Sequence, residues 1–98
     1  MKRILLVCNA GMSTSLLVTK MNEAATELNV EVKIWAVPSS EALENFEHAD
    51  ICLVGPQIRF MVSKFKNSTD IPVEPIDMIL YGRMDGKSVL QRALDVIG

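Results

Sequence analysis

Two short runs of apolar residues, Ile4–Val7 and Ile51–Val54, contain no alternation of apolar and polar positions. A strand that is covered on both faces, as in the middle of a parallel sheet, has this pattern. In the segment 30–37 apolar and polar residues alternate instead. The fourth expected strand contains Pro72 and Pro75. Alternation is typical of a strand with one partly wet face, and proline removes an amide donor. We therefore expect these two segments at the edges of the sheet.

Between the expected strands, apolar residues recur at spacings of three and four, which is the pattern of amphipathic helices. The long helical patterns cover residues 16–28, 57–66 and 89–97. A shorter acidic helix, capped by a serine, is expected over residues 40–48. The segment 79–86 is predicted to be a loop or a short turn.

Strands and helices alternate four times, which predicts an α/β fold with right-handed crossovers. We expect one domain over residues 1–98, with a four-stranded parallel open sheet and helices on both faces. Central positions for the first and third strands give the order 2-1-3-4. Ligands of open parallel sheets bind at the carboxyl ends of the strands, beside the point where the chain reverses direction. Cys8, directly after the first strand, lies at this point.

Composition narrows the classes of partner and chemistry. The chain is 49% apolar and 22% charged, with a net charge of −2 and scattered basic residues. This distribution does not favour binding to nucleic acid or to an anionic membrane surface. No apolar run approaches the ~20 residues that span a bilayer, so we expect a cytoplasmic protein without membrane insertion. Cys8 and Cys52 are then expected to be thiols rather than a disulfide, and we predict no metal and no cofactor.

The segment after the first strand has the composition of an anion site. Gly11 permits a tight turn, and hydroxyl residues stand where a helix begins, so the backbone amides of residues 9–15 can converge on a phosphoryl group. Partial positive charge at a helix start favours the thiolate of Cys8, which is the nucleophilic form. We predict Cys8 as the nucleophile. The predicted phosphate-binding residues are Asn9, Ala10, Gly11, Met12, Ser13, Thr14 and Ser15.

The sequence Cys-Asn-Ala-Gly-Met-Ser-Thr-Ser-Leu-Leu-Val from Cys8 resembles the IIB component of the bacterial sugar phosphotransferase system (PTS), most closely its lactose, cellobiose and chitobiose type. The turn at residues 54–58, the length and the order of elements agree with this family. The resemblance implies that Cys8 accepts a phosphoryl group from a phosphohistidine of the IIA protein. It implies transfer of this group to a β-linked disaccharide held by the membrane permease IIC, and a fold similar to low molecular weight tyrosine phosphatases. We further expect a monomer.

Four other residues with reactive or polar side chains were considered. Gln57 and Tyr81 are candidate auxiliary residues, since their loops are expected on the same side of the sheet as Cys8, but each can equally be an ordinary loop residue. Cys52 lies inside the third strand and is expected in the core. His48 precedes that strand, at the end of the sheet away from Cys8, and is poorly placed to carry phosphate.

Two other functions remain open from the sequence. A low molecular weight phosphatase or an arsenate reductase similarly has a cysteine between a first strand and a helix. These enzymes need an arginine six positions later, where this chain has Thr14. Without the bidentate charge of arginine, amides alone would bind a phosphate ester weakly. The second alternative is a non-enzymatic regulatory module with an incidental cysteine.

Overall fold

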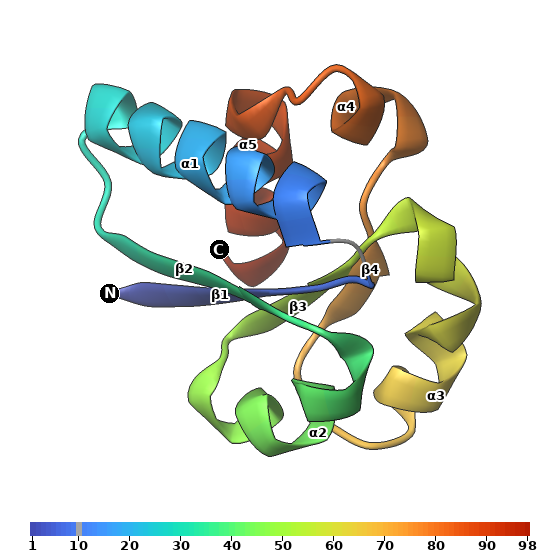
Figure 1. The fold of residues 1–98 in the computed structure, drawn as a ribbon. Coiled ribbons are helices and arrows are strands. Elements are labelled where there is room, and N and C mark those ends of the chain that lie inside the picture. Colours follow the sequence, from blue (N-terminus) through green and yellow to red (C-terminus); the bar gives the residue numbers. More distant parts are fainter. Residues whose placement is uncertain (10) are drawn as a thin grey trace.

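A computed structural model describes residues 1–9 and 11–98, and their side chains except those of residues 11–13. It contains a parallel sheet of four strands in the order β2-β1-β3-β4, as predicted (Figure 1). The strands are β1 (Lys2–Val7), β2 (Val32–Val37), β3 (Ile51–Val54) and β4 (Val73–Pro75). The two uninterrupted apolar runs are the central strands, and the two other segments are the edges.

Helices cover both faces of the sheet, with α1, α4 and α5 on one face and α2 and α3 on the other (Figure 1). The α-helices are α1 (Gly11–Leu28), α2 (Ala42–Asn45), α3 (Val62–Lys66), α4 (Met78–Gly82) and α5 (Gly86–Ile97). Short 3₁₀ helices precede or follow them: η1 (Ser39–Glu41), η2 (Phe46–His48) and η3 (Pro56–Met61).

Several local expectations need correction. The segment 57–66, expected as one helix, divides into η3 and α3 with non-helical backbone at Ile58, and the last helix begins at Gly86 rather than at Val89. Three further differences concern α1, α4 and the acidic helix. First, α1 begins at Gly11 rather than at Leu16, so Ser13–Ser15 belong to its first turns. Second, the segment 79–86 is not only a loop. It contains part of α4, because the Asp77 carboxylate accepts hydrogen bonds from the N–H groups of Ile79 and Leu80 at 2.9 and 3.0 Å. Such a side-chain cap stabilises a short helix.

The third correction concerns the expected serine cap of the acidic helix. The cap positions of η1 and α2 are Pro38 and Glu41, and neither makes a side-chain cap hydrogen bond. The hydroxyl of Ser39, which follows β2, instead donates to Oδ1 of Asn9, which follows Cys8 at the same edge of the sheet.

The apolar runs of β1 and β3 are explained by two cores, one on each face of the sheet. Ile4 and Leu6 point into the core beneath α1 and α5, whereas Leu5 and Val7 point into the core beneath α2 and α3. All four side chains are fully buried. Each position from Ile4 to Val7 is therefore apolar, since neither face of this part of β1 meets water.

The carboxyl ends of the strands are held in one row by hydrogen bonds that continue the sheet. The Cys8 N–H donates to the Val37 carbonyl at 3.2 Å, and the Gly55 N–H donates to the Val7 carbonyl at 2.8 Å. The residues that follow β1 and β3 are thereby neighbours. Across the described ranges, no helix is both long and apolar enough to cross a bilayer.

Candidate functional site

Cys8 lies at the carboxyl end of β1, where the sequence places it, and its side chain is 7% exposed. Its Sγ is hydrogen-bonded to the Oγ1 of Thr14, and either atom can be the donor. Thr14 is itself 2% exposed and lies in α1, close to the start of the helix. The residue six positions after the cysteine therefore contacts the sulfur through a hydroxyl group.

This geometry suits an anion at the sulfur. A hydroxyl can donate to a thiolate or to a phosphoryl oxygen, and hydrogen bonds to ionised acceptors are stronger than neutral ones. The first N–H groups of an α-helix have no partner within the helix, and the helix dipole makes that end partly positive. In α1 no acidic residue occupies the first turn. The helix start therefore presents donors and no opposing carboxylate.

Gly55 forms the neighbouring wall of the site. A Cβ atom at Gly55 would lie 3.0 Å from the Cys8 Cβ and 3.5 Å from the Gln57 Oε1. A carbon atom 3.0 Å from another carbon is closer than van der Waals contact allows. A side chain at position 55 would therefore push Cys8 by a few tenths of an ångström, and the same close approach brings the exposed Gln57 amide near the nucleophile.

A second turn approaches from the β2 side. Ser39 Oγ donates to Asn9 Oδ1 at 3.1 Å, which joins the residue after Cys8 to the start of η1. At residues 38–40 the sequence led us to expect only a serine cap for the acidic helix, so the contact of Ser39 with the cysteine loop was not predicted. The signal was present, since these residues follow a strand of the same parallel sheet and must lie at the same edge as Cys8.

The other predicted site residues are placed to different degrees. Asn9 is exposed next to Cys8 in the chain, and Ser15 is exposed on α1. Ala10 lies outside the described residues, as do the side chains of Met12 and Ser13, and Gly11 contributes only its backbone to the start of α1. Within the described residues, no group of three His, Cys, Asp or Glu side chains is arranged to hold a metal ion.

Tyr81 lies on α4 with its ring in the core beneath α1 and α5, and it is 6% exposed. Its hydroxyl is buried and has no hydrogen-bond partner among the described residues. An unsatisfied buried hydroxyl is uncommon and costs free energy. Its auxiliary role stays a prediction.

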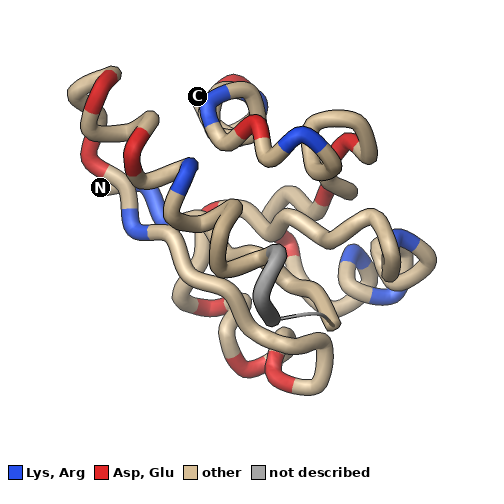
Figure 2. The backbone as a smooth tube through the Cα atoms, turned by 45° about the horizontal axis from the view of Figure 1, so that its top comes forward, with Lys and Arg blue, Asp and Glu red and all other residues tan. Residues whose placement is uncertain are grey.

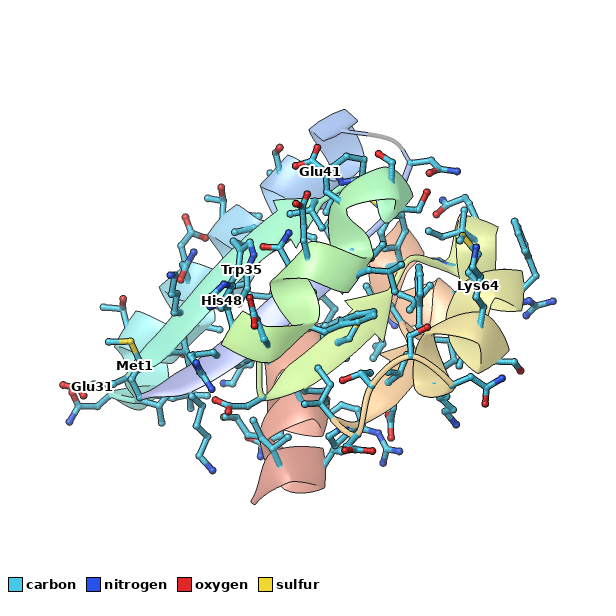
Figure 3. The ribbon with its side chains drawn as sticks, turned by 90° about the horizontal axis from the view of Figure 1, so that it is seen from below. Met1, Glu31, Trp35, Glu41, His48 and Lys64 are labelled. Atoms are coloured by element: carbon cyan, nitrogen blue, oxygen red, sulfur yellow. The ribbon has the colours of Figure 1, made fainter. Side chains whose placement is uncertain are left out.

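Cys52 and His48 lie outside the site, as predicted. Cys52 is a free thiol in β3 with no exposed surface, and burial raises its pKa to about 12. It therefore remains protonated and weakly nucleophilic at neutral pH. His48 ends η2, is mostly exposed and lies along the acidic helices, as Figure 3 shows.

The family model for "PTS system, Lactose/Cellobiose specific IIB subunit" matches residues 3–92. The chain belongs to this family, in agreement with the resemblance of its cysteine loop. IIB components of the PTS are phosphotransferases in sugar phosphorylation. By its family, the chain is thus a phosphotransferase.

Individual relatives agree with this family. The chain is 48% identical over 100 residues to the oligo-beta-mannoside-specific EIIB component of Bacillus subtilis, with 99% of this chain and 97% of the relative covered. It is 40% identical to the galactose-specific EIIB component of Lactococcus lactis, with 94% and 93% covered. The solution structure of the cellobiose-specific IIB component from Borrelia burgdorferi superposes with a TM-score of 0.82 at 38% identity, covering 98% of this chain and 91% of that chain.

Proposed function

We propose that Cys8 is the phosphoryl carrier of this IIB component. The Cys8 thiolate attacks the phosphorus of a phosphohistidine on IIA in line, so that the S–P bond forms as the N–P bond breaks and its electron pair returns to the imidazole. In the second step a sugar hydroxyl held by IIC attacks the same phosphorus and loses its proton, and the S–P bond breaks. IIA therefore supplies the phosphohistidine and IIC holds the sugar hydroxyl, so this chain needs neither group.

The observation that carries this proposal is the contact between Cys8 Sγ and Thr14 Oγ1 at the start of α1. The transferring group spreads negative charge over its oxygens, and preorganised donors stabilise it without being consumed. The Thr14 hydroxyl and the amides of residues 9–15 are the proposed donors. Ser13 and Ser15 add hydroxyls, and Gln57 adds an amide that can turn its Nε2 toward the group.

The same contact argues against hydrolysis as the main activity. A phosphatase must bind a free phosphate ester, and arginine provides the bidentate charge for this. Thr14 provides one neutral hydroxyl at that position. A partner protein that delivers the group supplies the binding energy through its own surface, so a weak anion site is sufficient.

We further propose that the chain works in the cytoplasm as a monomer and serves the uptake of a β-linked disaccharide through IIC. Relatives at 48% and 40% identity are named for oligo-beta-mannoside and for galactose, so the sugar differs among similar chains. This supports a specificity that lies in the membrane component. The uptake role is tested by growth on single β-linked disaccharides after deletion of this chain. If the deletion strain still grows on every one of them, this part of the proposal is contradicted.

Reconstitution tests the function itself. The chain is incubated with phosphoenolpyruvate, the general PTS proteins and a matching IIA, and the label bound to the chain is measured. We expect a thiol-bound phosphoryl group that is lost when IIC and sugar are added. Rapid turnover of p-nitrophenyl phosphate by the chain alone would instead indicate a phosphatase, and a regulatory module would do neither.

A further inference from the structure

A groove of about 880 Å³ runs beside the edge strand β4, between η3 and α3 on one side and α4 and α5 on the other. We name it the β4 groove. Its floor contains buried apolar side chains such as Leu53 and Val89. Pro56 lines one end, and the adjacent Gly55 packs against Cys8. The groove therefore begins next to the proposed nucleophile.

Some charged side chains along the β4 groove have partners and others have none among the described residues. Arg92 forms a bidentate pair with Glu74 at 3.0 and 3.1 Å. The Asp77 carboxylate caps α4, as described above. The cations Arg59 and Lys66 also line the groove, and neither has an ion pair or hydrogen bond within the part of the chain that the structure describes. The groove thus offers two uncommitted positive charges.

These two cations belong to a locally basic segment of the chain. Residues 51–69 contain three basic residues and no Asp or Glu, whereas residues 34–58 contain four acidic residues and no Lys or Arg. Figure 2 shows basic positions on the coil at the right and acidic positions at the bottom, with further charges of both signs over the rest of the backbone. Glu41 and Lys64 mark the two regions in Figure 3. A partner that covers Cys8 meets acidic residues toward α2 and basic residues toward α3.

Exposed apolar side chains border the same groove. Met78 and Ile79 line it and are 59% and 67% exposed. Exposed apolar groups that gather in one place mark interaction sites. The occupant that fits has acidic residues for Arg59 and Lys66 and apolar residues for this lip.

We propose that the β4 groove docks an acidic and apolar segment of the IIA donor. This inference rests on the proposed function. The phosphohistidine of the donor is itself anionic, so the same basic wall steers it toward Cys8. The other partner is a membrane permease, and cytoplasmic loops of membrane proteins carry an excess of Lys and Arg. Such loops would be repelled by Arg59 and Lys66.

The test uses charge reversal in the full chain. Arg59→Glu and Lys66→Glu alter the groove. Lys64→Glu is the matched control, because Lys64 is exposed on α3, as Lys66 is, but does not line the groove. Phosphoryl transfer from phosphorylated IIA is measured at varied IIA concentration and salt. We expect each groove variant to raise KM about threefold to tenfold with kcat unchanged, and to weaken the salt dependence. Lys64→Glu should change KM by less than about twofold.

Each result has a distinct meaning. Wild-type KM in both groove variants, or an equal rise in Lys64→Glu, overturns the docking site. Failure of the wild-type chain to accept any phosphoryl group from IIA overturns the proposed function instead. Ile79→Ala, compared with Leu43→Ala on α2, tests the apolar lip independently of charge. Both side chains are mostly exposed, so both variants are expected to fold.

Discussion

Thr14 is the residue that separates this site from a phosphatase site. It occupies the position of the phosphatase arginine, and its hydroxyl contacts the Cys8 sulfur instead of offering a charge. The contact is buried on both sides, because Thr14 is 2% exposed and Cys8 is 7% exposed. A buried neutral donor can stabilise an anion that a partner delivers, whereas it attracts a free phosphate ester only weakly.

Replacing Thr14 tests this role. Thr14→Val keeps the shape of the side chain and removes the donor, so we expect transfer from IIA to Cys8 to slow on the order of a hundredfold. The cost in unfolding free energy should be only about 1 kcal/mol. Single-turnover transfer rates and urea unfolding measure the two effects. Thr14→Ser keeps the hydroxyl and should retain most of the rate; equal slowing in both variants would contradict a role for the hydroxyl.

Gly55 offers a second test at the same scale. In Gly55→Ala the new methyl group meets the Cys8 Cβ at 3.0 Å, so the nucleophile must shift. We expect a transfer rate lower by about tenfold, since small misplacement of a reacting atom is costly. Gly82→Ala is the control, because a Cβ there has no neighbour within 4 Å. A normal rate in Gly55→Ala would show that this turn does not position Cys8.

The sequence predicted that Cys8 and the turn at Gly55 lie at the same edge of the sheet, because the carboxyl ends of parallel strands meet there. It did not predict the side-chain contacts. The pairing of Ser39 with Asn9 joins residues that are 30 positions apart, and the hydroxyl of Thr14 could equally have capped the helix. Such contacts depend on how loops from different strands pack, which periodicity does not encode.

At the scale of elements, helix ends were the hardest to predict. The glycine at the start of α1 has low helix propensity, so the apolar pattern alone suggested a later start at Leu16. The short α4 depends on Asp77 and is too brief to show a period. The central strands were predicted well, because fully buried strands have apolar residues on both faces.

The junction between β1 and β3 carries a pH-dependent contribution to stability. Asp50 Oδ2 accepts from the Arg3 N–H at 2.8 Å, and Oδ1 accepts from the Arg3 Nη2 at 3.1 Å. The side-chain and backbone hydrogen bonds from Arg3 hold the pKa of Asp50 below its ordinary value. A lowered pKa stabilises the folded state above the unfolded pKa of about 3.9, and this stabilisation is lost as pH falls through the folded value.

We therefore expect Asp50→Asn to remove part of the loss of stability that the wild-type chain shows as pH falls below about 4. The effect should be small, since both side chains are partly exposed. Urea unfolding across this pH range measures it. Arg3→Gln keeps the backbone N–H donor and should remove less of the slope. Identical pH slopes in wild type and Asp50→Asn would contradict the assignment.

At the scale of the whole molecule, the fold places one sulfur between two differently charged surfaces. The β2 side leads from Ser39 to the acidic residues of α2, and the β3 side leads from Gly55 to the basic wall of the β4 groove. A carrier must meet a donor and an acceptor in turn at the same atom. Because acidic residues lie on one side of Cys8 and basic residues on the other, a donor and an acceptor can bind over the same sulfur in different orientations. No second site is then needed.

The central claim is that Cys8, and no other residue, carries the phosphoryl group. The most direct measurement is mass spectrometry of the intact chain and its peptides after incubation with phosphorylated IIA, for wild type, Cys8→Ser and Cys52→Ser. We predict one added phosphoryl group on the Cys8 peptide in wild type and in Cys52→Ser, and none in Cys8→Ser. A phosphoryl group retained by Cys8→Ser but lost from Cys52→Ser would contradict the account.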